Sequence, residues 1–132
     1  MTRKIAFFDA KPYDIKSFTE MNKDFGFDIA YFETHLNAQT ASLSGDFDAV
    51  CAFVNDTIDK AVIDEIIKHG VKLIALRCAG YNNVDFKAAY KKIHIARVPA
   101  YSPYAVAEHA AALMFSLNRK THRAFFRTRD GN

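Results

Sequence analysis

Short apolar runs alternate with amphipathic stretches along the first hundred residues of the chain. The runs predict five β-strands, at residues 5–8, 27–32, 49–54, 71–76 and 93–98. The third run is almost continuously apolar, as is typical of a strand that is buried on both faces of a sheet. The pattern therefore predicts a layered structure with strands in its interior.

Helical spacing appears in the stretches between these runs. Pro12 suits the first turn of a helix, and apolar residues follow it at helical intervals, at Ile15, Phe18, Met21 and Phe25. A weaker helix is expected at residues 38–43, ended by Gly45. Because strands and helices alternate in this way, the chain is predicted to form parallel βαβ units and an α/β layered sheet.

Capping residues mark two more helices. Thr57 is expected to cap a helix that closes at His69 and Gly70. The apolar stripe of this helix consists of Ile58, Val62, Ile63, Ile66 and Ile67. Asp85 is expected to cap a short helix that runs through Lys91. These elements complete one domain over residues 1–100.

The end of the chain is expected to form one long helix, from about residue 103 to residue 127. Its apolar residues lie on one side of that helix: Val106, Ala110, Leu113, Met114, Leu117 and Phe125. A five-stranded domain does not need this stripe for its own core, so we interpret the helix as a link to a further part of the protein. Left exposed, the stripe favours a homo-oligomer built through the C-terminal helix.

Composition describes an ordinary globular domain. Half of the 132 residues are hydrophobic and a quarter are charged, and the net charge of +3 is too small to argue for a nucleic-acid partner. No apolar stretch is long enough to span a membrane, and residues 5–8 are too short for a signal peptide. Cys51 and Cys78 form no CxxC motif. We interpret them as reduced thiols of a cytoplasmic protein, with a disulfide between them as the minor alternative.

Residues 77–85, RCAGYNNVD, are the most informative segment. They follow a predicted strand and open a helix, which is where open α/β sheets bind ligands. Ala79 and Gly80 are small enough to let a ligand approach the backbone, whose N–H groups can hold a carboxylate, and Gly80 permits a positive φ. The alternative is an ordinary loop in which Asn and Asp cap the following helix.

Residues 98–109, VPAYSPYAVAEH, also follow a strand. Tyr101 lies between two prolines that stiffen the loop, so its hydroxyl is a candidate for contact with a polar ligand, although it could equally be a surface tyrosine. Glu108 and His109 point about 100° apart on a helix and do not converge on one substrate. The remaining histidines lack metal-ligand spacing, so no metal site is expected.

Both segments resemble the corresponding loops of D-lactate dehydrogenases, in the D-2-hydroxyacid dehydrogenase family. Residues 53–56, FVND, and residues 117–130 fit the same family, so the resemblance covers nearly the whole chain. It implies a flavodoxin-like fold: a parallel five-stranded sheet with helices on both faces, plus the long C-terminal linking helix. By this likeness residues 1–100 are the substrate-binding domain, and residues 101–132 are a hinge and the first helix of a missing Rossmann cofactor domain.

The resemblance also implies roles for individual residues. The backbones of Ala79 and Gly80, flanked by Cys78, would hold the substrate carboxylate, Tyr101 would contact the polar end of the substrate, and Phe53 would face its methyl side. The substrate would be a small 2-oxo or 2-hydroxy acid such as pyruvate or D-lactate. The family's catalytic Arg, Glu and His come from later motifs, and neither Arg77 nor His109 takes over those roles.

The nicotinamide cofactor of the family has no recognisable site in this sequence. NAD would serve the parent enzyme, but no GxGxxG motif occurs and no cofactor is expected to bind this chain. The chain alone is therefore expected to be inactive. One alternative is a free-standing flavodoxin-like module that binds a small carboxylate without catalysis. Another is polyanion binding by the basic residues near the end, Arg119, Lys120, Arg123, Arg127 and Arg129, although a solvated helix face is the commoner reason for such a cluster.

Overall fold

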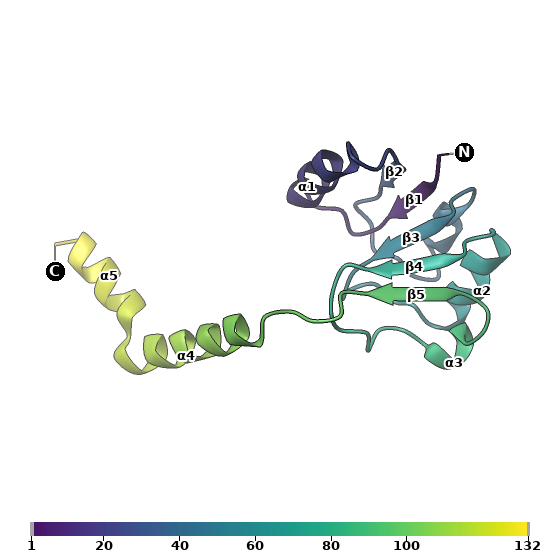
Figure 1. The fold of residues 1–132 in the computed structure, drawn as a ribbon. Coiled ribbons are helices and arrows are strands. Elements are labelled where there is room, and N and C mark those ends of the chain that lie inside the picture. The colour runs from purple at the N-terminus through teal and green to yellow at the C-terminus, as the bar shows by residue number, and fades with distance from the viewer. Residues whose placement is uncertain (1, 132) are drawn as a thin grey trace. The chain divides into compact units, whose positions relative to one another are not determined.

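The computed structural model describes residues 2–131 and divides into two compact units, Met1–Pro99 and Ala100–Asn132. Figure 1 shows the sheet in the first unit and a pair of helices in the second. Because the positions of the two units relative to each other are not determined, each is described by itself.

The first unit is built on one parallel sheet with the strand order β2-β1-β3-β4-β5. Its strands are β1 (Lys4–Phe7), β2 (Asp28–Tyr31), β3 (Ala49–Ala52), β4 (Leu73–Leu76) and β5 (His94–Arg97). All five predicted strands are confirmed; β1 is as long as its apolar run and begins one residue earlier, and the other four are shorter than theirs. The order is that of flavodoxin-like folds, as the resemblance implied.

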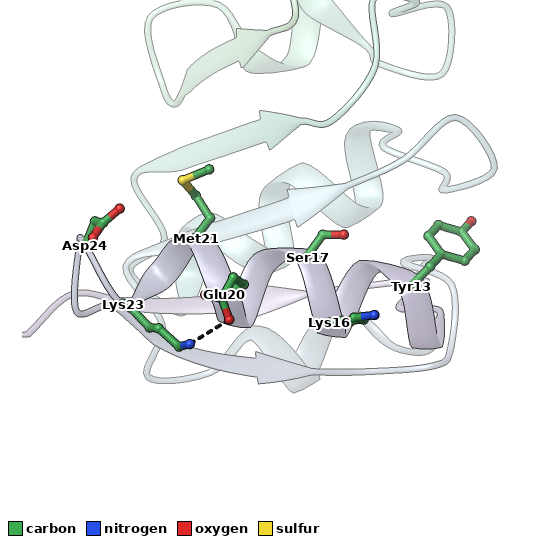
Figure 2. Close-up of a pocket in the computed structure, with 7 residues that line it drawn as sticks. All are labelled: Tyr13, Lys16, Ser17, Glu20, Met21, Lys23 and Asp24. Carbon is green, nitrogen blue, oxygen red and sulfur yellow. Dashed lines mark hydrogen bonds and ion pairs between the residues drawn. The ribbon is translucent and has the colours of Figure 1, made fainter.

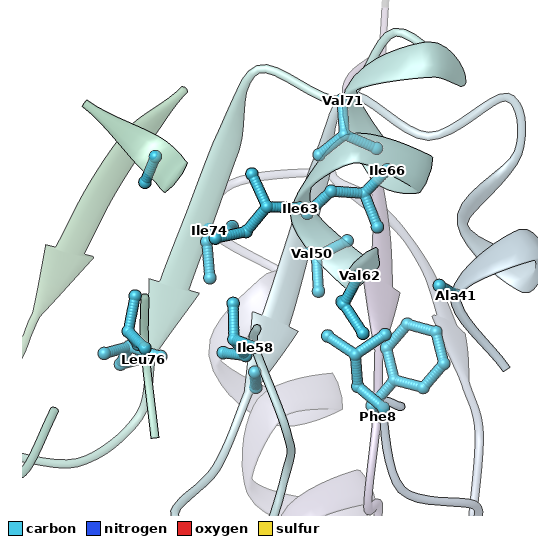
Figure 3. Packing of buried hydrophobic residues seen from close by; sticks show 14 of the residues in the cluster. Phe8, Ala41, Val50, Ile58, Val62, Ile63, Ile66, Val71, Ile74 and Leu76 are labelled. Carbon is cyan, nitrogen blue, oxygen red and sulfur yellow. The ribbon is translucent and has the colours of Figure 1, made fainter. Parts of the chain in front are cut away.

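Side chains of successive strand residues point to opposite faces of the sheet, and both faces carry a hydrophobic cluster. The larger cluster contains Ala6 and Val50 from the strands and the buried residues of the helix α2 (Lys60–Lys68). Figure 3 shows this packing around Ile63 and Ile74. The smaller cluster, around Phe7 and Cys51, packs against Ile15 of the helix α1 (Pro12–Asn22). Helices therefore cover both faces of the sheet.

Local hydrogen bonds explain where the helices of this unit begin. Pro12 occupies the first position of α1, where a missing N–H costs nothing. Asp59, not Thr57 as predicted, caps α2: its carboxylate accepts from Val62 N at 3.0 Å. Asp85 caps the helix α3 (Phe86–Ala89) as predicted, accepting from Ala88 N.

The structure also tests the helix expected at residues 38–43 and the predicted end of α2. The weak helix expected at residues 38–43 is a short 3₁₀ helix, η1 (Ala41–Ser44), and Gly45 follows it directly. The predicted end of α2 is confirmed, because His69 is its C-cap residue and Gly70 adopts a left-handed φ of 87°.

The second unit contains two helices where one was predicted. They are α4 (Pro103–Arg119) and α5 (Thr121–Arg129). Lys120 between them has a φ of 53°, a left-handed conformation that interrupts the helical hydrogen bonds. No residue of α4 or α5 is buried. Within residues 2–131, no helix combines the length and the apolar character needed to cross a membrane.

Candidate functional site

The carboxyl ends of β3 and β4 bring two of the predicted site segments together. Phe53 directly follows β3, and residues 77–85 directly follow β4. Arg77 N donates to Ala52 O at 3.1 Å, and the Asn83 side chain donates to Phe53 O at 2.9 Å. The structure therefore places Phe53 beside the loop that contains Ala79 and Gly80. Tyr101 belongs to the second unit, where it is exposed.

The amide groups of Ala79 and Gly80 are free to bind a ligand. Among the residues that the structure describes, neither N–H donates a hydrogen bond to a protein acceptor. A Cβ added to Gly80 would meet no atom within 4 Å, so the backbone faces open space there. Two adjacent N–H groups without a protein partner have the chemistry to hold a small anion such as a carboxylate, provided that both point toward it.

Gly80 differs from the sequence expectation in one respect. The prediction allowed for a positive φ, but Gly80 does not adopt one, in contrast to Gly26, Gly70 and Gly131. Its lack of a side chain therefore matters for access to the backbone and not for the conformation of the turn. An alanine at this position should keep the fold, because its Cβ would meet no protein atom within 4 Å.

Arg97 stabilises this loop from the neighbouring strand, a role that the sequence analysis missed. Its Nη1 donates to Ala79 O at 3.0 Å and to the carbonyls of Val98 and Pro99, both at 3.2 Å. The guanidinium carbon also lies 5.1 Å from the centre of the Tyr81 ring. Because Arg97 binds the carbonyl of Ala79, the peptide between Ala79 and Gly80 has a fixed orientation. The available signal was a charged residue at the end of a short β-strand.

Arg77 supports the Phe53 side of the site. Its guanidinium carbon lies 4.4 Å from the centre of the Phe7 ring and 4.6 Å from that of Phe53. Its Nη1 and Nη2 donate to Phe8 O at 3.0 Å and to Asp9 O at 2.8 Å. Arg77 is therefore placed to hold the Phe53 ring.

A buried carboxylate fixes the turn that begins at Phe53. The side chain of Asp56 is fully buried and accepts from Phe53 N at 2.6 Å and from Leu36 N at 2.8 Å. Burial raises the pKa of Asp56, and the two backbone hydrogen bonds oppose this effect. His35 lies near, with Nδ1 3.7 Å from Asp56 Oδ1 and 3.5 Å from Asp9 Oδ1. The sequence analysis assigned no role to Asp56, His35 or Asp9.

The two cysteines are free and poorly reactive thiols. Burial raises the pKa of Cys51 to about 11. It also raises the pKa of Cys78, whose Sγ donates to Gly80 O at 3.3 Å. A neutral thiol beside Gly80 adds no negative charge to the proposed anion site.

A groove elsewhere on the first unit has a different lining. The groove has a volume of about 520 Å³ and lies on the surface of α1 and the turn after it. Figure 2 shows its lining residues, with Tyr13 at one end and Asp24 at the other. Its charged side chains include Lys23 and Glu20, which pair with each other at 2.6 Å. The described residues contain no cluster of His, Cys, Asp and Glu arranged to hold a metal ion.

Comparison with known proteins identifies the same segments as part of an enzyme fold. The family model "D-isomer specific 2-hydroxyacid dehydrogenase, catalytic domain" matches residues 5–130. The D-lactate dehydrogenase of Escherichia coli is 50% identical over 130 residues, which are 98% of this chain and 40% of that protein. A 2-hydroxyacid dehydrogenase homolog of Schizosaccharomyces pombe is 52% identical over 96% of this chain and 39% of its own length.

Solved structures agree with these matches. The apo-structure of the E. coli D-lactate dehydrogenase has a TM-score of 0.85 with 50% identity, and covers 98% of this chain and 41% of its own. The D-lactate dehydrogenase of Lactobacillus jensenii, solved with NAD+, has a TM-score of 0.71 with 30% identity over 98% of this chain and 40% of its own. The chain thus spans about 40% of the length of these relatives.

Proposed function

The chain belongs to the D-isomer specific 2-hydroxyacid dehydrogenase family, and from this membership we propose that it is the substrate-binding part of a D-lactate dehydrogenase. The parent reaction is reversible hydride transfer between NADH and pyruvate, which gives D-lactate. The observation that carries the proposal is the pair of amides at Ala79 and Gly80, which donate to no protein acceptor among the described residues and lie in a loop that is hydrogen-bonded to Phe53. A reduced, cytoplasmic setting fits the two free thiols.

The chemistry of a 2-oxo acid fits this arrangement. The carboxylate accepts from the two amides, and the fixed Ala79–Gly80 peptide needs little reorganisation when it binds. The side of the substrate that carries its methyl group then turns toward the ring of Phe53. Tyr101 remains our proposal for the residue that contacts the polar end of the substrate.

The residues of this chain do not fit a nicotinamide dinucleotide. Such sites use clustered glycines between a strand and the helix that follows it, whereas the glycines here are isolated at positions 26, 45, 70, 80 and 131. We therefore derive no step of hydride transfer from these residues, and propose that NAD binds a different part of the parent protein. Relatives solved with NAD+ support this choice of cofactor.

Titration of the ¹⁵N-labelled chain with oxamate, a pyruvate analogue, tests the substrate site. We expect the largest shifts at the amides of Ala79 and Gly80, and no such shifts with the uncharged amide of pyruvic acid. Gly80→Ala should abolish these shifts while leaving the thermal midpoint nearly unchanged, because the added Cβ meets only open space. Oxamate shifts that avoid both amides would exclude the proposed carboxylate site.

Turnover by the chain itself is the second test. Without a dinucleotide site, the purified chain should not oxidise NADH in the presence of pyruvate, whereas an enzyme that includes the rest of the parent sequence should. Measurable turnover by the pure chain would contradict this part of the proposal.

We further propose that the chain forms a homo-oligomer through α4. Apolar side chains on this helix are largely exposed, including Val106 at 61%, Leu113 at 52% and Leu117 at 71%, and a surface of this kind tends to associate. Light scattering should show a mass that rises with concentration, and Leu117→Glu should shift it toward the monomer. A strictly monomeric mass at high concentration would exclude the oligomer.

A further inference from the structure

The side-chain amide of Asn83 joins the two loops of the proposed substrate site. Its Nδ2 donates to the carbonyls of Phe53 and Asp56, both at 2.9 Å. Only the nitrogen of an asparagine amide carries hydrogens, so two carbonyl partners fix how this amide is oriented. Asn83 therefore uses both of its hydrogens to hold the turn at residues 53–56 against the loop at residues 77–85.

The turn that receives these bonds has little freedom of its own. Phe53 O also accepts from Asp56 N at 3.1 Å, which closes the turn, and Phe53 N donates to the Asp56 carboxylate at 2.6 Å. These two hydrogen bonds make the turn at residues 53–56 one rigid body, which carries the Phe53 ring. Asn83 is the side chain that ties this body to the loop of Ala79 and Gly80.

The main chain of Asn83 is held independently of its side chain. Ile58 N donates to Asn83 O at 3.0 Å, and Asp85 N donates to Ile58 O at 2.9 Å. Ile58 and Val84 form an isolated parallel bridge, and both are buried. Because these bonds remain when the side chain is changed, a substitution at Asn83 should loosen the turn of Phe53 without releasing the loop.

We propose that Asn83 is a positioning residue that sets the distance between the Phe53 ring and the amides of Ala79 and Gly80, and so determines how large a 2-oxo acid the site accepts. This inference rests on the proposed function. A substrate held by its carboxylate at the amides directs its alkyl group toward Phe53. A turn held tightly by Asn83 therefore favours a methyl group over anything longer, and a loosened turn admits the longer group.

Two matched variants test the inference on the 132-residue chain. Asn83→Asp removes both donated hydrogens and sets a carboxylate against two carbonyls. Asn82→Asp makes the same change of charge at the exposed neighbouring position. Dissociation constants for pyruvate and for 2-oxobutanoate, which is one methylene longer, are measured by NMR titration of each variant. Asn83→Ala removes the hydrogens without adding a charge, and serves if the aspartate variant fails to fold.

The readout is the preference for pyruvate over 2-oxobutanoate. One methylene in a close-fitting pocket changes affinity by about 10-fold or more, so we expect the Asn83 variants to lose about 10-fold of this preference and Asn82→Asp to keep it. A purely structural role for Asn83 would weaken both acids by the same factor. That result, or an unchanged preference, would overturn the inference.

A failure of the proposed function gives a different result. In that case the unsubstituted chain would bind neither acid. The tie that Asn83 makes between the turn and the loop is then judged from the backbone amide resonances of Phe53 and Asp56. If the tie exists, both resonances shift in Asn83→Asp and in Asn83→Ala but stay in place in Asn82→Asp. Unmoved resonances in the Asn83 variants would overturn the tie itself.

Discussion

The guanidinium carbon of Arg77 lies 4.6 Å from the centre of the Phe53 ring, and the same group contacts the Phe7 ring at 4.4 Å. The side chain is only 10% exposed. A planar guanidinium can contact aromatic faces while its edges donate hydrogen bonds, and Arg77 does both. This arrangement joins the ends of β1, β3 and β4 directly beneath one wall of the proposed site.

Arg77→Lys should therefore destabilise the first unit strongly. A lysine ammonium keeps the charge but cannot contact both rings and donate to Phe8 O and Asp9 O together, and the carbonyl that it abandons is left without its partner. We expect a loss of about 2–4 kcal/mol in the free energy of unfolding, measured with urea. Arg3→Lys is the control: Arg3 makes an exposed pair with Asp48, and its replacement should have little effect. Equal effects of the two variants would contradict this account of Arg77.

Asp56→Asn should destabilise the chain by removing one of two buried hydrogen bonds. Each carboxylate oxygen accepts a backbone N–H, whereas an asparagine presents one donor group, which would face the N–H of Phe53 or of Leu36. The expected cost is about 1–3 kcal/mol in urea unfolding. Asp59→Asn makes the same chemical change at the N-cap of α2, where asparagine caps as well as aspartate, and should be nearly neutral.

The sequence predicted the fold because its signals were local and repeated. Five apolar runs, each followed by a helical pattern or a turn, specify parallel βαβ units whatever their exact ends. Capping of α2 was assigned to Thr57 because threonine and aspartate are both good caps. A tertiary hydrogen bond explains why Asp59 caps α2 instead of Thr57, because Thr57 N donates to Leu36 O at 2.8 Å.

Residue types alone indicated the proposed site most clearly where it depends on the backbone, and the resemblance added Phe53. Ala79 and Gly80 stand out because small residues after a strand allow close approach to the amides, and their segment matches a known family. Arg97 and Asn83 act through carbonyls that are distant in sequence, Asn83 on Phe53 O thirty positions away. No periodicity or spacing marks such a contact. The break at Lys120 was missed for a related reason, because the apolar residues on both sides of it keep helical spacing.

The two thiols should differ in reactivity. Cys51 is 6% exposed, and burial raises its pKa to about 11, whereas Cys78 is only partly buried. At about pH 8, iodoacetamide should modify Cys78 slowly and Cys51 only when the chain unfolds, because the thiolate is the reactive form. Mass spectrometry of peptides over time measures both rates. Oxamate should slow the reaction of Cys78 if it binds at the neighbouring amides; faster labelling of Cys51 than of Cys78 would contradict the described burial.

Alkaline pH should unfold the chain in part through Cys51. Its folded pKa of about 11 lies above the ordinary value of 9.0, so the stability that depends on the neutral thiol is present below pH 9.0 and is lost as pH rises toward 11. The free energy of unfolding should thus fall more steeply over this range in the wild-type chain than in Cys51→Ala. Because lysines and tyrosines titrate in both chains, the difference between the two curves isolates the thiol.

The first unit should fold without the second. Every residue of the hydrophobic core lies within Met1–Pro99, and neither α4 nor α5 buries a side chain. A chain that ends after Pro99 should therefore keep the thermal midpoint of the full chain to within a few degrees. Trypsin should cut the full chain first around Arg119 and Lys120, next to the left-handed residue that separates the helices. A large fall in the midpoint of the shortened chain would show that the second unit stabilises the sheet.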